Sequence, residues 1–303
     1  MHITRRTLLA GSAASFLTPQ VGWSQTTFAA GDSRLDTLSD GHLVLPKSFS
    51  LGDVPMDEAD QILARYGISG DTLEPDCNVT LLRQDGRTVL FDVGAGPDFM
   101  PTAGTLMDAV DALGVAPSDV TDVIFTHAHP DHLWGLLDDF GDFVFPDAAY
   151  HMGRTEWDYW TDPNTVSTID AARQIFAVGA SSRLAELRDQ INLFSDGAEI
   201  LPGVAARATP GHTPGHMAFE VRVGGDPVMI VGDSILNHHV AFERPDWLSG
   251  SDQDAPTAAQ TRMSLLDQLA QSQMLMVGFH LPNGGLGRVA RRGEHFEFVG
   301  EDG

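Results

Sequence analysis

Three histidines and an aspartate within residues 127–132 constrain the fold of this chain more than any other feature. They follow residues 123–126, a short apolar and β-branched run that is typical of a buried strand. Imidazole and carboxylate groups at a strand end are unfavourable in an apolar core but are good ligands for a divalent cation. Pro130 fixes its own φ angle and so restricts the loop before any ion binds. The segment predicts a metal site.

Three further apolar runs end in residues that can bind a metal. Residues 204–208 lead into a segment with His212 and His216, residues 228–231 lead into Asp233, and residues 274–279 lead into His280. If these runs are strands, each ligand lies at the carboxyl end of a strand, so the loops can meet along one edge of the fold. Cys77 is the single cysteine, which excludes a thiolate metal site and an intramolecular disulfide.

Composition bounds the class of protein and its partners. The chain has 303 residues, 42% of them hydrophobic, and 31 glycines, as is typical of a globular α/β protein of one large or two small domains. Its 42 acidic and 18 basic residues give a formal charge of -24. That charge repels phosphate backbones and anionic lipid surfaces. We therefore expect a small-molecule substrate, and neither nucleic acid nor a membrane as partner.

Residues 1–25 are predicted to be an export signal outside the fold. Paired arginines at positions 5 and 6 precede an apolar run of small residues, which is typical of a twin-arginine signal. The run is too short to span a bilayer comfortably, and cleavage is expected between residues 24 and 30. An ordinary secretory leader is the alternative and gives the same destination. We therefore expect a periplasmic protein with one domain over residues 26–303.

The rest of the chain alternates strand-like runs with turns and helices. Residues 79–82 and 88–91 flank Asp85-Gly86 and predict a hairpin. Helical spacing predicts four helices, over residues 106–113, 168–179, 183–189 and 256–272. Ile175 and Phe176 are expected to face inward. The mixture predicts sheets with helices on their outer faces.

The pattern His-x-His-x-Asp-His, followed by a distant histidine, an aspartate and a last histidine, resembles the metallo-β-lactamase superfamily. The resemblance covers the chain from about residue 40 onward. It implies a four-layer αββα sandwich, an α/β fold with two divalent cations at one edge of its two sheets. Zinc is the expected metal, with manganese, iron or cobalt as alternatives.

The resemblance also assigns the ligands. They form two groups that share Asp233: His127, His129 and His212 for one cation, and Asp131, His132 and His280 for the other. Asp233 would bridge both cations, and Asp131 and Asp233 are the expected catalytic carboxylates. Asp92, in a turn after an apolar run, would orient one of the ligand imidazoles.

Within the superfamily the chain is most similar to the periplasmic methyl parathion hydrolase-like group. The similar segments are residues 39–41, 91–94, 158–160, 211–216 and 280–282. Trp134 and Asn283 depart from that group, and His238 and His239 are additions without an assigned role. These departures concern the substrate and leave the metal chemistry intact.

Two divalent cations that share a water lower its pKa to about 7 and supply hydroxide at neutral pH. We therefore expect a dinuclear hydrolase whose metal-bridging hydroxide cleaves an ester, lactone or phosphotriester. Four aromatic side chains are expected to wall an apolar pocket above the cations: Trp134, Trp157, Trp160 and Phe176. No Ser-His-Asp pattern or dinucleotide-binding fingerprint is evident in the sequence.

The sequence is also compatible with other functions. A thioester or thiol-conjugate hydrolase of sulfur metabolism would use the same two cations. A mononuclear iron sulfur dioxygenase belongs to another class, and the complete second ligand set argues against it. The acidic charge disfavours a nuclease, and the intact ligand set disfavours an accessory protein without turnover. A homodimer is compatible with each of these functions.

Overall fold

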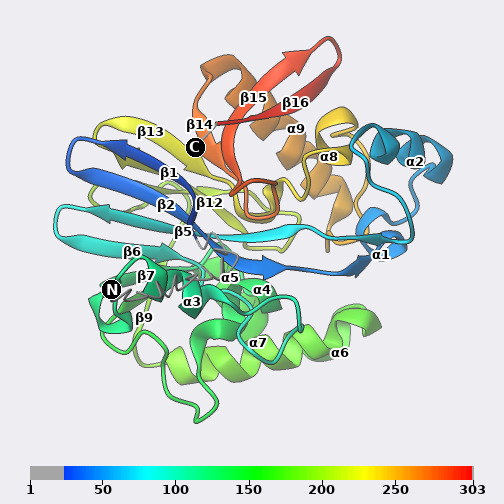
Figure 1. Cartoon of the computed structure of the whole chain (residues 1–303). Helices are drawn as coiled ribbons and strands as arrows, with labels where there is room; N and C mark the ends of the chain where they lie inside the picture. Colours follow the sequence, from blue (N-terminus) through cyan, green and yellow to red (C-terminus); the bar gives the residue numbers. More distant parts are fainter. Residues whose placement is uncertain (1–23, 302–303) are drawn as a thin grey trace, which may run out of the picture.

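The computed structural model describes residues 24–301 as two facing sheets with helices outside them (Figure 1). The expected export signal, residues 1–25, lies almost wholly outside the described residues and stays a prediction. The first strand begins at Ser24, within the segment in which cleavage is expected. Within residues 24–301 no helix is long and apolar enough to cross a bilayer.

The first sheet has seven strands in the order β1-β2-β5-β6-β7-β8-β9. Their bounds are Ser24–Ala30, Ser33–His42, Asp76–Gln84, Arg87–Phe91, Asp122–Ile124, Ala149–Gly153 and Ile191–Phe194. The expected hairpin is the antiparallel pair β5 and β6. Its turn places Asp85 and Gly86 at φ angles of 50° and 73°, the left-handed region that Asp-Gly turns use. From β6 to β9 the strands run parallel, so their carboxyl ends reach one edge.

The second sheet also has seven strands, in the order β10 to β16. Their bounds are Glu199–Leu201, Val204–Ala208, Met217–Val223, Asp226–Ile230, Leu275–Val277, Leu286–Arg292 and His295–Gly300. Neighbours are antiparallel except for β13 and β14, which are parallel. The apolar runs that precede His212, Asp233 and His280 are therefore strands, as the sequence predicts.

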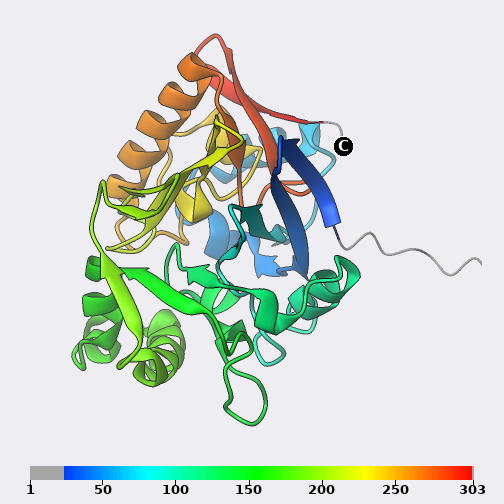
Figure 2. The same cartoon turned by 90° about the vertical axis from the view of Figure 1, so that its left-hand side faces the viewer.

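Helices cover the outer face of each sheet. Those on the first sheet are α3 (Leu106–Ala112), α4 (Pro130–Leu133), α5 (Arg154–Thr161), α6 (Thr165–Thr168) and α7 (Gln174–Leu187), and those on the second are α8 (Val240–Glu243) and α9 (Ala255–Ser272). Figures 1 and 2 show α7 and α9 on opposite outer faces with the strands between them. Separate apolar cores fill the three interfaces. The predicted four-layer αββα sandwich is confirmed.

A small arch of chain precedes β5 and packs beside α8. It contains β3 (Leu45–Pro46), α1 (Lys47–Leu51), α2 (Met56–Arg65) and β4 (Thr72–Leu73). Its own apolar core joins Leu51 and Ile62 of the arch to Val240 and Trp247. The arch is thereby fixed over one end of the sandwich (Figure 1).

The predicted helices over 168–179 and 183–189 are wrong in their bounds. The structure has one continuous helix, α7, over Gln174–Leu187. The prediction that Ile175 faces inward is also wrong, because its side chain is 65% exposed. The helix instead turns Ala177, Ala180 and Leu184 toward the first sheet. Because an α-helix has about 3.6 residues per turn, Ile175 falls on the side of α7 opposite these three residues.

Candidate metal centre

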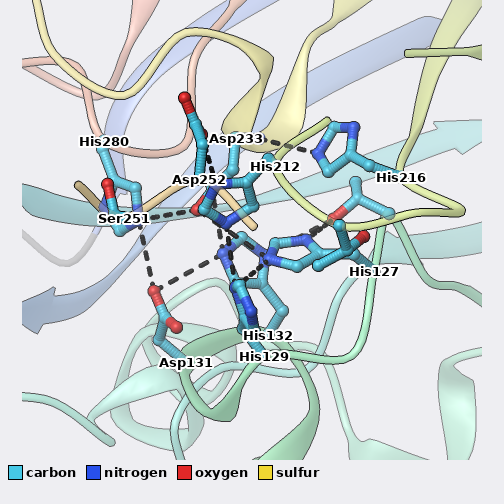
Figure 3. A network of polar contacts seen from close by, with 12 residues as sticks. His127, His129, Asp131, His132, His212, His216, Asp233, Ser251, Asp252 and His280 are labelled. Atoms are coloured by element: carbon cyan, nitrogen blue, oxygen red, sulfur yellow. Dashed lines mark hydrogen bonds and ion pairs between the residues drawn. The ribbon is translucent and has the colours of Figure 1, made fainter. Parts of the chain in front are cut away.

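The loops that follow four strands meet at one edge of the sandwich. β7, β11, β13 and β14 end at Ile124, Ala208, Ile230 and Val277, shortly before the segments with the expected ligands. Because β6 to β8 run parallel, and β13 and β14 run parallel, the loops after them leave the sheets at the same edge. Figure 3 shows the resulting cluster of imidazoles and carboxylates. The structure thus brings all seven expected ligands together.

Three histidines of the first group face one another. His129 Nδ1 lies 3.0 Å from His127 Nε2 and 2.8 Å from His212 Nε2. Asp233 Oδ2 lies 3.2 Å from His212 Nε2 and 3.8 Å from His127 Nε2. One possible ligand atom of each of these residues lies within 4.8 Å of the others. This is the group that the resemblance to the superfamily assigns to the first cation.

The second group shares Asp233 with the first. His132 Nε2 lies 3.4 Å from Asp131 Oδ2 and 3.2 Å from Asp233 Oδ1. His280 Nε2 lies 3.2 Å from Asp131 Oδ2 and 3.3 Å from Asp233 Oδ2. Asp233 therefore touches residues of both groups, which is the place of a bridging ligand.

The donor set fits two divalent cations. Asp131 Oδ2, His132 Nε2 and Asp233 Oδ1 are buried without a hydrogen-bond partner among the described residues. Such orphaned polar atoms cost about 1–3 kcal/mol each. Imidazole nitrogen and carboxylate oxygen are ligands that zinc and its neighbours accept. All three atoms belong to residues of the second group, of which Asp233 is shared with the first, so a cation there would satisfy the atoms that the protein leaves unpaired.

Burial and mutual charge set the protonation of the cluster. Burial lowers the pKa of His127 and His129 well below the usual histidine value, so both are neutral and able to bind a cation. Burial acts in the same direction on His132, but Asp233, Asp131 and Asp92 outweigh it and raise its pKa. Burial would raise the pKa of Asp233, yet His280 and His132 hold it well below its usual range. A cation binding to the second group would displace the proton of His132.

Residues outside the two groups orient the ligands. Asp92 Oδ2 lies 2.8 Å from His132 Nδ1, and Asp92 Oδ1 accepts the Thr126 N–H at 2.8 Å. The sequence predicts this role for Asp92. His216 Nε2 accepts the backbone N–H of Asp233 at 2.9 Å. Burial lowers the pKa of His216 to about 3, so this imidazole is neutral. Fixed partners of this kind hold ligands in the orientation that a cation needs.

Sequence reasoning missed a carboxylate and an arginine behind His212. Asp252 Oδ1 lies 3.0 Å from His212 Nδ1, and its Oδ2 lies 3.5 Å from Arg262 Nη1. Arg262 is 3% exposed and stands in α9 between the buried residues Ala258 and Leu266. An arginine on the apolar face of a predicted helix is the signal that points to a buried partner. Asp252 lies in a loop and gives no such signal.

A cavity of about 460 Å³ opens above the ligands. Its floor is formed by His129, Asp131, His212, Asp233 and His280. Its walls carry apolar side chains from three parts of the chain: Leu45, Phe49 and Ile68 of the arch, Phe99 after β6, and Phe176 of α7. His238 and His239 also line this cavity, beside Tyr66, and belong to neither ligand group. A largely apolar cavity thus leads directly to the metal ligands.

Of the four aromatic residues expected to wall the pocket, Phe176 lines the cavity, whereas Trp134, Trp157 and Trp160 do not. Trp160 is 1% exposed and donates its indole N–H to Glu156 at 2.6 Å. The Arg183 guanidinium lies over the Trp134 ring, with its Cζ atom 4.5 Å from the ring centroid. Trp157 packs against the core between the first sheet and its helices. The prediction is wrong for these three residues because their indoles are engaged in these contacts within the protein and not in the wall of the cavity.

Comparison with known proteins agrees with the geometry. Residues 72–280, which include all seven ligands, match the Metallo-beta-lactamase superfamily. The hydrolase AbOPH, of the beta lactamase superfamily, has a TM-score of 0.86 and 25% sequence identity, over 93% of this chain and 99% of that one. AidC, a dizinc quorum-quenching lactonase, has a TM-score of 0.85 and 24% identity, over 93% and 99%.

Among relatives known by sequence, the N-acyl homoserine lactonase AttM of Azorhizobium caulinodans is 29% identical over 148 residues. That match spans 47% of this chain and 52% of AttM. The similarity to the methyl parathion hydrolase-like group stays a prediction. The chain belongs to the metallo-β-lactamase superfamily and is a metal-dependent hydrolase.

Proposed function

We propose that the protein uses two divalent cations to hydrolyse a neutral ester or lactone that carries an apolar arm. The observation that carries this proposal is the apolar cavity whose floor is made of the metal ligands themselves. A carbonyl group that enters the cavity reaches the ligands, while an acyl or aryl arm contacts Phe49, Phe99 and Phe176. AidC and AttM, which are lactonases, support the choice of a lactone.

Different residues of the site would hold the cations and bind the substrate. His127, His129 and His212 would hold one cation, Asp131, His132 and His280 the other, and Asp233 both. When bound, such a pair of cations polarises a carbonyl and lowers the pKa of water, so hydroxide is available at neutral pH. Cys77 is fully buried and does not line the cavity, so it is not placed to attack a substrate. The apolar walls exclude bulk water and orient the arm of the substrate.

A matched substrate panel tests the proposal. Metal-loaded protein is assayed with phenyl acetate, short-chain and long-chain N-acyl homoserine lactones, a thioester, a phosphotriester and a phosphodiester, with zinc and with manganese. We expect the highest kcat/KM on a lactone or aryl ester, weaker turnover of the phosphotriester and none of the phosphodiester. The acidic chain repels a polyanion, so electrostatic steering does not favour a phosphodiester such as DNA or RNA. Fastest turnover of the phosphodiester would overturn the proposal, and fastest turnover of the thioester would favour a sulfur-linked substrate.

We also propose that residues 1–25 export the protein to the periplasm, on the strength of the arginines at positions 5 and 6. A fusion of residues 1–30 to a reporter is expected to reach the periplasm, and the double variant Arg5→Lys, Arg6→Lys to stay in the cytoplasm. Unchanged export of the double variant would favour an ordinary secretory leader instead.

A further inference from the structure

We propose that Glu156 is a positioning residue for the first cation, a role that rests on the metal centre proposed above. Glu156 is the third residue of α5, and its side chain is fully buried. It belongs to neither ligand group and does not line the cavity. Its carboxylate instead joins the two loops that carry the three histidines of the first group.

The first link follows from the order of the strands. β7 and β8 are parallel neighbours, so the loops after them leave the first sheet side by side. The loop after β7 carries His127 and His129, and α5 follows β8 directly. Glu156 Oε1 accepts the N–H of Ala128, the residue between those two histidines, at 3.0 Å. Glu156 thereby fixes the backbone from which two of the three imidazoles project.

The second link runs to the loop that carries His212. Glu156 Oε2 accepts the Thr213 hydroxyl at 2.7 Å and the Gly215 N–H at 3.0 Å. Gly215 lies so close to α5 that a Cβ atom there would be 2.1 Å from the backbone nitrogen of Glu156. The loop therefore rests directly on the first turn of α5. One carboxylate sets the distance between the two loops.

The carboxylate has no accepting capacity left over. Trp160 Nε1 donates the fourth hydrogen bond, at 2.6 Å to Oε1, so each oxygen accepts two bonds. A carboxylate offers about four acceptor sites. A glutamine at this position would keep the shape but turn an NH₂ group toward one pair of donors. Glu156→Gln therefore removes the acceptor of at least one backbone N–H, that of Ala128 or that of Gly215, without altering a metal ligand or the cavity.

The consequence is measured as metal affinity. Removal of a group that orients metal ligands weakens metal binding by about 10–100-fold. We expect that loss for the first cation in Glu156→Gln, because His129 and His212 would no longer be held at a fixed separation. Metal-free protein is titrated with Co²⁺, and the visible absorption of each cobalt site gives its Kd.

Two further variants separate positioning from general stability. Trp160→Phe removes the hydrogen bond that comes from within α5 and keeps both loop links, so its Kd is expected to stay within about threefold of wild type. Thr213→Val removes one loop link and is expected to weaken the first site by about three- to tenfold. If Glu156→Gln does not fold, Thr213→Val decides the question.

A merely structural role would lower the Tm of the metal-free protein and leave the cobalt Kd unchanged. A Kd within twofold of wild type in Glu156→Gln, or in Thr213→Val, would therefore overturn the inference. So would equal weakening in Trp160→Phe. The titration contains no substrate, so a failure of the proposed ester and lactone hydrolysis would appear in the substrate panel alone.

Discussion

Phe176 and Ile175 are neighbours in α7 that differ in their surroundings, and this makes them a matched pair for testing the cavity. Phe176 lines the cavity, whereas Ile175 is 65% exposed outside it. Phe176→Ala is expected to raise KM for a long-chain acyl lactone by about tenfold, since lost apolar contact of this size costs about 1–2 kcal/mol. A short-chain lactone should be affected little, and Ile175→Ala should change neither KM. Equal effects on both chain lengths would place the acyl arm elsewhere.

Asp36 is a buried carboxylate in β2, and it links stability to pH. Burial would raise its pKa, but hydrogen bonds from Arg34, Thr27 and Arg83 outweigh burial and lower it. Because its folded pKa lies below the unfolded value of about 4, its stabilisation is present above pH 4 and is lost as the pH falls through the folded pKa.

Asp36→Asn is therefore expected to reduce the free energy of unfolding by about 2 kcal/mol at pH 7, and by less at pH 3. Urea unfolding at the two pH values measures this. Asp32→Asn, at an exposed turn residue, serves as the control. A loss of stability in Asp36→Asn that is the same at both pH values would contradict the assigned charge linkage.

At the scale of single residues, the sequence predicts the ligands and one support, Asp92, but not the supports Glu156 and Asp252. The ligands stand at the ends of local apolar runs, a pattern that is visible along the chain. Glu156 and Asp252 act through contacts with loops 28 to 59 residues away, such as Ala128 and Gly215 for Glu156. The direction of the Trp160 indole depends on the same tertiary contact. No local pattern encodes such pairs.

Among the elements, α7 shows how a glycine can mislead a prediction. A helix end is expected at Gly179, yet α7 continues through it to Leu187. A Cβ atom on Gly179 would lie 2.4 Å from Cζ2 of Trp134, so the glycine makes room for that indole. By contrast, α9 and the β5–β6 hairpin follow their predicted patterns, because Pro256 and Asp85-Gly86 are local signals.

Gly179→Ala is the corresponding test of this packing. Helix propensity alone would make the substitution stabilising by up to about 1 kcal/mol. We expect destabilisation of about 1–3 kcal/mol instead, since the new methyl group overlaps Trp134. Val178→Ala, at the neighbouring 54% exposed position, should change Tm little. A higher Tm in Gly179→Ala would show that the indole moves aside freely.

At the scale of the whole molecule, loops from both sheets meet at the metal centre, and Asp233 belongs to both ligand groups there. The first sheet supplies residues 127–132, and the second supplies His212, Asp233 and His280. Cations bound between them would connect the two halves of the sandwich. Ligands that bind only the folded state stabilise it. Removal of metal is therefore expected to lower Tm, and readdition of zinc to restore it.

The measurement that tests the central claim most directly is the number of divalent cations per chain in fully loaded protein, determined by elemental analysis. The two ligand groups around Asp233 predict two cations per chain. Hydrolysis should be lost when chelation brings that number to zero and should return as it rises again. At most one cation per chain in the loaded protein, or full activity with none, would contradict the account.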